Sequence, residues 1–303
     1  MVGRDDYALK AGEAGEVSAP DLDYLPPHPA RPHRTALIGA GGISFAHLDA
    51  YRSHGFDVAV ILSRDAARAQ ARRDEVAPKA EVMTDYAALL ARDDFAVVDL
   101  TPHPAERLPM MEAALHAGKH VQSQKPFVTD LDTGERLCAL AEAKGLLLAV
   151  NQNGRWAPHL AWMRAGLVMS VHVALHWDHR WIAGTRFAAI PDVVMYDFGV
   201  HWFDFVTSVM DRPARRVMAQ AVAGPATGFP PMLASALLDF GDAQASLVFG
   251  AATPFGPLLV AIETGVPPDT AARGNLVSLA NTFAALAVAR TGQAAVPGQI
   301  RRR

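Results

Sequence analysis

A glycine-rich turn between a short apolar segment and a helical pattern constrains the fold of this chain more than any other feature. Residues 39–44 read Gly-Ala-Gly-Gly-Ile-Ser and directly follow the apolar residues 35–38. In this context a G-x-G-x-x-G sequence binds a pyrophosphate, because glycines let the phosphates approach the backbone and the helix N-terminus offers free N–H groups. Ser44 replaces the third glycine and is still small. We expect dinucleotide contacts from Gly39, Gly41, Gly42 and Ile43. A tight turn without a ligand is the alternative.

Short apolar segments alternate with helical patterns after this turn. The expected strands are Thr35 to Gly39, Val58 to Leu62, Ala96 to Thr101, His120 to Gln124 and Leu146 to Asn151. Such alternation is typical of βαβ units. It predicts an α/β Rossmann-like, doubly wound parallel sheet over residues 34–155.

The pattern changes near Pro158, which predicts a second domain over residues 156–303. Its expected strands cover residues 170–177, 215–222, 233–240 and 244–250, and a Gly241-Asp242 turn suits an antiparallel hairpin between the last two. Helices are expected from about Asp197 and from about Asn275 to Arg290. This is an α+β domain. Residues 1–33 are rich in proline and are interpreted as an extended arm.

Composition narrows the ligands and the compartment. The net charge is −3 and basic residues cluster only at residues 301–303, which argues against nucleic acid or a membrane surface as partner. The one cysteine, Cys138, excludes an intramolecular disulfide and a cysteine-based zinc site. Residues 1–20 lack the apolar run of a secretory signal, and the most apolar stretch, residues 145–150, is far shorter than the roughly 18 residues of a membrane span. We expect a cytoplasmic protein.

The end of the second expected strand bears on the choice of cofactor. An acidic residue at this position binds the ribose 2′-hydroxyl of NAD, whereas this chain has Ser63-Arg64. A hydroxyl followed by a guanidinium can hold a 2′-phosphate through charge-assisted hydrogen bonds. The sequence therefore favours NADP, with NAD as the alternative. In a second interpretation Arg64 points into solvent and Asp65 caps the next helix.

Two groups of polar residues are candidates for chemistry. Lys125, in Gln124-Lys125-Pro126, follows the fourth expected strand, where an open α/β sheet binds its ligand; a solvated Lys-Pro turn is the alternative. Asp197, His201 and Asp204 are spaced to share one helix face beside aromatic residues. We expect Asp197 and His201 to face a cavity and to act on substrate, and Asp204 to serve as an anchor.

The segment His176-Trp177-Asp178-His179 suggests a metal site at first sight. On a strand, residues 176 and 178 share one face and residue 179 points to the other, which does not suit a simple chelate. We expect no metal here. His176 and His179 are instead expected to line the substrate pocket, and an ordinary exposed strand end is the alternative.

Taken together, these motifs resemble those of the Gfo/Idh/MocA oxidoreductases, the family of glucose-fructose oxidoreductase and inositol dehydrogenase. The resemblance runs from about Arg34 to the C-terminus and rests on the glycine turn, on Thr101-Pro102, on Ala117 to Val121 with Lys125-Pro126, on Asn153 to Pro158, and on Asp197 to His201 with Asp204. It implies a Rossmann domain followed by a mainly antiparallel open sheet that often builds an oligomer interface. It also implies a catalytic set of Lys125, Asp197 and His201, cofactor contacts from Thr101, Pro102, His103, Gln124 and Lys125, and substrate contacts from Asn153, Arg155 and Trp156.

Two departures from this family pattern stand out. The usual Glu before Lys-Pro is Gln124, which removes a negative charge beside Lys125. Residues 249–263 leave little room for the further strands of such relatives, so the second sheet is expected to be shortened. We expect an NADP-preferring dehydrogenase for a small polyol or sugar, forming a homo-oligomer through an exposed face of that sheet that includes Leu237, Leu247 and Phe249. A non-catalytic nucleotide- or ligand-binding paralogue is the rival hypothesis.

Overall fold

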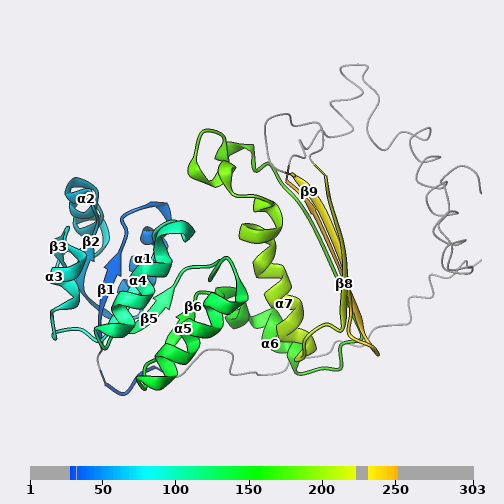
Figure 1. The fold of residues 1–303 in the computed structure, drawn as a ribbon, viewed down its shortest axis with the longest axis horizontal. Helices are drawn as coiled ribbons and strands as arrows, with labels where there is room; N and C mark the ends of the chain where they lie inside the picture. The colour runs from blue at the N-terminus through cyan, green and yellow to red at the C-terminus, as the bar shows by residue number, and fades with distance from the viewer. Residues whose placement is uncertain (1–27, 32, 223–230, 252–303) are drawn as a thin grey trace, which may run out of the picture. The chain divides into compact units, whose positions relative to one another are not determined.

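The first sheet of the molecule contains six parallel strands. The computed structural model describes residues 28–31, 33–222 and 231–251, and the described residues form one compact unit. The strands are β1 (Arg34–Ile38), β2 (Asp57–Leu62), β3 (Glu81–Met83), β4 (Val97–Leu100), β5 (His120–Ser123) and β6 (Leu148–Val150). Their order in the sheet is β3-β2-β1-β4-β5-β6 (Figure 1). The order reverses beside β1, which is the place where open α/β sheets bind dinucleotides.

Five helices cover this sheet: α1 (Gly42–Ser53), α2 (Ala66–Val76), α3 (Tyr86–Leu90), α4 (Pro104–His116) and α5 (Leu131–Ala143). Alternate residues of β1 belong to different cores. Leu37 packs with Leu48 of α1 and Val76 of α2, whereas Ile38 packs with residues of α3, α4 and α5. Because both faces are covered, the strands are apolar throughout rather than alternating. The predicted doubly wound Rossmann-like sheet is confirmed.

One strand and one helix were not predicted from the sequence. β3 has three residues and lies at the edge of the sheet, and the following helix α3 has five. Glu81 of β3 is exposed, and Val82 and Met83 are only half-buried, so no apolar run marks this strand. As a result, the strand that precedes Lys125 is the fifth along the chain and not the fourth.

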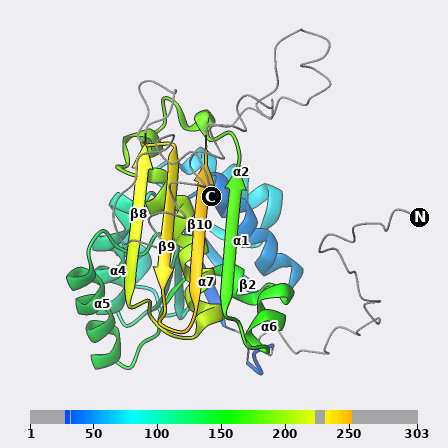
Figure 2. The same cartoon turned by 90° about the vertical axis from the view of Figure 1, so that its right-hand side faces the viewer.

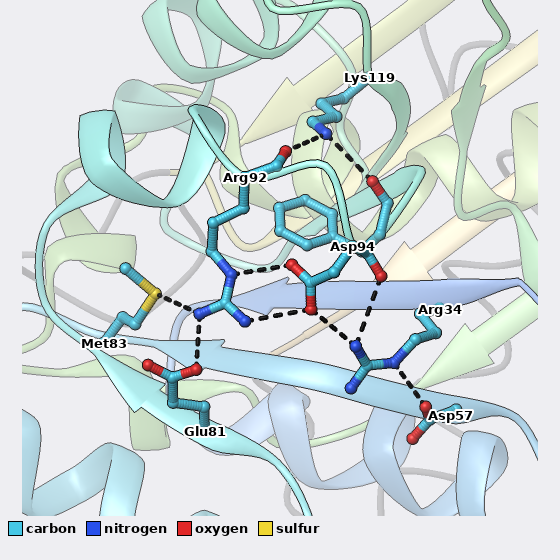
Figure 3. Close-up of polar contacts among 8 residues, drawn as sticks. Arg34, Asp57, Glu81, Met83, Arg92, Asp94 and Lys119 are labelled. Carbon is cyan, nitrogen blue, oxygen red and sulfur yellow. Dashed lines mark hydrogen bonds and ion pairs between the residues drawn. The ribbon is translucent and has the colours of Figure 1, made fainter.

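An ion-pair network lies at the amino ends of the strands, away from the glycine turn. Arg34 contacts both Asp57 and Asp94 at 2.6 Å, and Arg92 contacts Asp94 and Glu81 (Figure 3). The neighbouring Lys119 is 7% exposed. Its ammonium group donates to the carbonyl groups of residues 92 and 95, at 2.5 and 3.0 Å. These contacts join the starts of β1, β2 and β3 to the segments that precede β4 and β5.

The second sheet contains β7 (Ser170–His176), β8 (Arg216–Val222), β9 (Leu233–Asp239) and β10 (Gln244–Gly250), in the order β7-β10-β9-β8 (Figure 2). β9 pairs antiparallel with β8 and β10, and β7 pairs parallel with β10. The predicted hairpin at Gly241 is present, and Gly241 has a φ of 95°, which suits glycine. The predicted α+β second domain with a mainly antiparallel sheet is confirmed.

Part of the expected exposed face of this sheet is buried. Leu247 and Phe249 are 0% and 1% exposed, so their assignment to an exposed face was wrong. Both face the helical segments that follow β7, where the ring of Phe249 meets that of Phe198 edge-on. Leu237, with 40% exposure, lies on the open face as expected. Alternation along β9 and β10 explains the difference, because neighbouring residues point to opposite faces.

Several expectations concern residues outside those described: the proline-rich arm up to residue 27, the helix from Asn275 to Arg290, and the shortened end of the second sheet. The three domain boundaries stay predictions. No helix in the described residues is long and apolar enough to cross a membrane.

The buried ammonium of Lys119 gives the first testable prediction. Lys119→Met should lower the free energy of unfolding by roughly 1–3 kcal/mol, because two carbonyl groups lose their donor. The exposed Lys79 provides a matched control, and Lys79→Met should change stability by less than about 0.5 kcal/mol. Urea denaturation measures both, and equal effects would contradict this role for Lys119.

Candidate functional site

The glycine turn lies at the edge of a cavity at the carboxyl ends of β1, β2 and β4. Gly39 has a φ of 101°, and a Cβ atom there would lie 2.6 Å from Thr101 Oγ1, so only glycine fits. Added Cβ atoms at Gly41 and Gly42 would meet nothing within 4 Å, which leaves the turn open towards a ligand. Thr101 fixes the turn by donating to the carbonyl of Ile38 at 2.8 Å. These features suit a pyrophosphate at the start of α1.

This cavity has a volume of about 740 Å³ and collects most of the predicted cofactor residues. They come from the glycine turn, from the end of β2 and from the segment after β4: Gly39, Gly41, Gly42, Ile43, Ser63, Arg64, Thr101, Pro102 and His103. Gln124 and Lys125 line a second cavity of about 410 Å³, together with Asp197 and His179. The two cavities share Ile43, Thr101 and Pro102, so one elongated ligand can reach both.

Lys125 lies where these cavities meet the second sheet domain. Its ammonium nitrogen donates to the Asp197 carbonyl oxygen at 2.7 Å and lies 3.2 Å from Asp197 Oδ1. The two side chains are only 19% and 14% exposed. An ammonium group has three N–H donors, so one remains for a ligand hydroxyl. The site can therefore donate a hydrogen bond or a proton to the oxygen of a bound ligand.

Asp197 does not lie in a regular α-helix. Residues Val194–Gly199 form a π-helix, η4, and the α-helix α7 (Val200–Met210) follows it. A Cβ atom at Gly199 would lie 3.1 Å from the Val194 carbonyl oxygen, so the close packing of this wider turn suits glycine. The assumed regular helix across Asp197 and His201 was therefore wrong in detail, since the π-helix widens the spacing. Both residues nevertheless line cavities that also contain Lys125.

His201 lines a smaller cavity of about 280 Å³ together with Lys125, Gln124 and Asn153. Burial lowers the pKa of His201 below its ordinary value of 6.5, and the positive charge of Lys125 adds to this shift. The imidazole is therefore neutral at neutral pH and can accept a proton. A neutral base and an ammonium group around one cavity form a pair suited to acid–base chemistry.

The remaining predicted substrate residues divide into two groups. Arg155 and Asp204 form a two-point ion pair with contacts of 2.5 and 2.9 Å, so Asp204 anchors Arg155 to α7. Arg155 and Trp156 line a separate cavity of about 670 Å³, and Asn153 borders both this cavity and the one at His201. The sequence analysis placed Asn153, Arg155 and Trp156 in one substrate pocket. Of these three residues, only Asn153 lines a cavity that also contains Lys125.

The two histidines around β7 lie in different surroundings. His179 is buried, accepts a hydrogen bond from Trp177 Nε1 at 3.0 Å, and lines the Lys125 cavity. Burial also lowers its pKa. His176 is exposed, on the face of β7 opposite the buried Val173. It therefore does not lie in the substrate pocket where the sequence analysis placed it. In the described part of the chain, no cluster of His, Cys, Asp or Glu side chains could hold a metal ion.

Sequence reasoning missed an aromatic wall opposite Lys125. Trp177 stacks near Phe198 with ring centroids 4.0 Å apart, and both line the 410 Å³ cavity. Trp181 and Phe187 line this cavity and also the 740 Å³ cavity. The aromatic residues between 177 and 187 were the sequence signal for this wall. Their positions depend on two short 3₁₀ helices, η2 (Arg180–Ile182) and η3 (Arg186–Ala189). Such short helices have no periodic sequence pattern from which they could be predicted.

A buried polar network beneath Lys125 was also missed. Asp99, with 0% exposure, accepts hydrogen bonds from Tyr51 and from His47 Nδ1, each at 2.7 Å. Burial and the nearby Asp99 carboxylate raise the pKa of Tyr51. His47 Nε2 in turn lies 3.0 Å from Gln124 Nε2 and 3.1 Å from Asn151 Nδ2. A carboxylate inside the apolar strand 97–100 was the available signal.

The orientation of Gln124 determines the tautomer of His47. Gln124 Oε1 accepts a hydrogen bond from the backbone N–H of Lys125 at 2.8 Å, so the amide NH₂ must point at His47. His47 Nε2 then accepts, and His47 Nδ1 donates its hydrogen to Asp99. The buried Arg107 of α4 holds the same backbone by donating to the carbonyl groups of Gln124 and Pro126. These contacts fix the main chain on both sides of Lys125.

This arrangement predicts the effect of restoring a carboxylate before Lys125. In Gln124→Glu, the NH₂ donor that faces the His47 Nε2 lone pair is lost and an acidic oxygen takes its place. We expect the free energy of unfolding to fall by roughly 1–3 kcal/mol, because a buried acceptor loses this donor. Urea denaturation measures the change, and an unchanged stability would contradict the geometry.

The fold and this site define a dinucleotide-binding Rossmann protein with a second, sheet-containing domain. Residues 33–152 match the Gfo/Idh/MocA family model, described as an oxidoreductase family with an NAD-binding Rossmann fold. The chain is 35% identical over 129 residues to an uncharacterized oxidoreductase of Schizosaccharomyces pombe, a match that covers 41% of this chain and 35% of that protein. It is 38% identical over 128 residues to dTDP-3,4-didehydro-2,6-dideoxy-alpha-D-glucose 3-reductase of Actinomadura kijaniata, covering 41% and 38%.

A solved structure extends the likeness in fold beyond the first domain. The oxidoreductase from Agrobacterium radiobacter in complex with NAD⁺, L-tartaric acid and magnesium matches with a TM-score of 0.68 and 22% identity, over 75% of this chain and 69% of that one. In sequence, the likeness to the Gfo/Idh/MocA oxidoreductases lies in the Rossmann domain. The segments matched in the two relatives cover little more than a third of their lengths.

Proposed function

We propose that this protein is an NADP-preferring oxidoreductase that transfers a hydride between the nicotinamide and a secondary alcohol or ketone of a sugar, inositol or related polyol. The observation that carries this proposal is the Lys125 ammonium, paired with Asp197 in the 410 Å³ cavity, which shares Ile43, Thr101 and Pro102 with the cavity of the glycine turn. The name of the Actinomadura kijaniata relative, a reductase of a nucleotide-linked sugar, supports the substrate class.

In this proposal the protein supplies the proton transfer and the positioning. The bound cofactor supplies the hydride. Lys125 exchanges a proton with the reacting oxygen through its remaining N–H, and the neutral His201 accepts or returns a proton beside it. Asp197 holds the ammonium group and orients neighbouring hydroxyls. Positioned proton transfer of this kind contributes roughly 10² to 10⁴ in rate.

The preference for NADP rests on the charges at the end of β2. Ser63 and Arg64 line the larger cavity, and the Arg64 side chain is 84% exposed, so a ligand can reach it. The acidic neighbour Asp65 caps α2 by accepting from the Arg68 N–H at 3.2 Å. That carboxylate is engaged, so a 2′-phosphate would meet mainly cationic groups. NAD is the alternative cofactor.

Lys125→Met is the direct test of the proposed chemistry. Turnover should fall by at least about 10² while NADP affinity stays within a few fold, because the pyrophosphate is held at the glycine turn. Lys144→Met, at an exposed lysine after α5, is the matched control and should leave both unchanged. Unchanged turnover in Lys125→Met would remove Lys125 from the mechanism. A collapse of cofactor binding would make it a binding residue instead.

The lowered pKa of His201 sets the expected pH dependence. Since burial disfavours the imidazolium, His201 stays neutral as the pH falls through 6.5, and kcat/KM for alcohol oxidation should decline only at a lower pH. His201→Asn should remove this acidic limb and lower the plateau. An acidic limb centred at or above 6.5 in the unchanged protein would contradict the role of His201 as the base.

The partners we propose are a small polyol or sugar and further copies of the same chain, joined through the open face of the second sheet. Met218, Val222, Leu237 and Val248 lie on this face and are each at least 40% exposed, and clustered apolar side chains often mark an interface. Light scattering at micromolar concentration should give a homo-oligomer. Leu237→Lys should shift it towards monomer, and a monomeric unchanged protein would contradict the proposal.

The rival function is a non-catalytic binder of nucleotide or ligand. Gln124 favours it, because the family pattern has an acidic residue there. The ion pair of Lys125 with Asp197 and the neutral His201 beside it favour the enzyme.

A further inference from the structure

A carboxylate lies between two arginines from distant parts of the chain, inside the 740 Å³ cavity. Glu106, in the first turn of α4, accepts from both arginines. Its Oε1 accepts from Arg186 Nη1 at 2.5 Å and from Arg64 Nη2 at 3.2 Å, and its Oε2 lies 3.5 Å from Arg64 Nη2. Arg64 follows β2, whereas Arg186 begins the 3₁₀ helix η3 between β7 and α7. A single anionic atom is therefore already bound by guanidinium groups of both sheet domains.

The side chains around Glu106 carry more positive than negative charge, which favours an anion with a larger charge than a carboxylate. Arg64, Arg68 and Arg186 line the cavity, against Asp65 and Glu106. Asp65 is engaged by Arg68, at 3.4 Å between Arg68 Nε and Asp65 Oδ2, which leaves Glu106 alone to balance Arg64 and Arg186. The Arg64 and Arg186 side chains are 84% and 59% exposed, so a ligand can reach them. The hydrogen bond from Arg186 lowers the pKa of Glu106, which stays ionised.

Arg186 is held at the cavity by more than this ion pair. The next residue, Phe187, packs its ring edge-on against His103, with centroids 5.1 Å apart. His103 is the N-cap residue of α4, three positions before Glu106. The start of η3 thus contacts the same helix end that carries Glu106, and this ring contact places the backbone of Arg186 beside the cavity independently of the ion pair.

We propose that Arg186 and Arg64 together form the subsite for the 2′-phosphate of NADP, and that Glu106 is an internal counter-ion which the phosphate replaces. This inference rests on the proposed function and deepens its choice of cofactor. A phosphate monoester carries about two negative charges and three acceptor oxygens, so it can pair with both guanidiniums, whereas Glu106 brings one negative charge to both. The end of β2 then supplies only half of the recognition, and the second domain supplies the other half.

Binding of two small probes to the full chain tests this subsite without turnover. The probes are 2′,5′-ADP, which carries the 2′-phosphate, and 5′-AMP, which lacks it, each titrated calorimetrically. Arg186→Met should weaken 2′,5′-ADP about tenfold or more, similar to Arg64→Met, and leave 5′-AMP within about twofold. Glu106→Gln should tighten 2′,5′-ADP by about threefold or more, because the competing charge is gone.

Matched variants control for general effects of charge. Arg180→Met removes an exposed arginine of the same segment that pairs with Asp178, and Glu112→Gln removes a carboxylate of α4 that pairs with Arg136. Both should leave the affinity for 2′,5′-ADP unchanged. Circular dichroism and thermal unfolding establish that each variant is folded.

The outcomes separate this inference from the proposed cofactor. If Arg186→Met leaves the ratio of the two probe affinities unchanged, or if Glu106→Gln weakens 2′,5′-ADP, the subsite is wrong. If the unchanged protein binds NAD at least as tightly as NADP, the proposed cofactor preference is wrong, and the two variants still decide whether Arg186 and Glu106 act on a 2′-phosphate.

Discussion

The contact between Lys125 and Asp197 is the interaction on which the candidate site depends, because it joins the end of β5 to the π-helix before α7. Both side chains are mostly buried, and a buried charge that loses its partner costs several kcal/mol. Neither residue would therefore be stable in this position alone. Together they keep an ammonium group at the meeting point of two cavities, with the neutral His201 nearby.

The main chain below Lys125 is fixed by groups that do not touch a substrate. Gln124 accepts a hydrogen bond from the Lys125 N–H and donates one to His47. Arg107 donates hydrogen bonds to the carbonyl groups on either side of Lys125. Burial lowers the pKa of Arg107 to about 10, so it remains charged at neutral pH. An amide at position 124 can donate to His47 Nε2 and accept from the Lys125 N–H at the same time, and an ionised carboxylate has no N–H to donate. The replacement of the family's usual Glu is therefore consistent with an intact, preorganised site, and does not by itself indicate lost function.

The first domain could be predicted from the sequence because each of its signals is local. The apolar strands, the glycine turn and the position of Lys125 after a strand depend on short stretches and on the βαβ rule. The exception is β3, which is too short and too exposed to leave an apolar pattern. Alternation also determined which residues of the second sheet are buried. The sequence analysis assigned Leu247 and Phe249 to the wrong face. The sequence pattern shows which residues share a face of the sheet, but not which face the helices cover.

The site was harder to predict, because its remaining parts meet only through tertiary contacts. The pair of Arg155 with Asp204, the wall formed by Trp177 and Phe198, and the network of His47 join residues tens of positions apart. The π-helix at Asp197 cannot be read from regular helical spacing. Conversely, the predicted residues at the ends of β1, β2, β4 and β5 lie near one another, since the carboxyl ends of parallel strands meet at one edge, and their roles in binding stay predictions.

The central claim is that this site transfers a hydride and does not only bind a nucleotide. The most direct measurement follows the absorbance of the reduced nicotinamide while the protein and NADP are mixed with a panel of sugars, inositols and other polyols. The account predicts growth of this absorbance with at least one secondary alcohol. Proven NADP binding with no absorbance change across the panel, and none in reverse with the corresponding ketones, would contradict it and favour the non-catalytic binder.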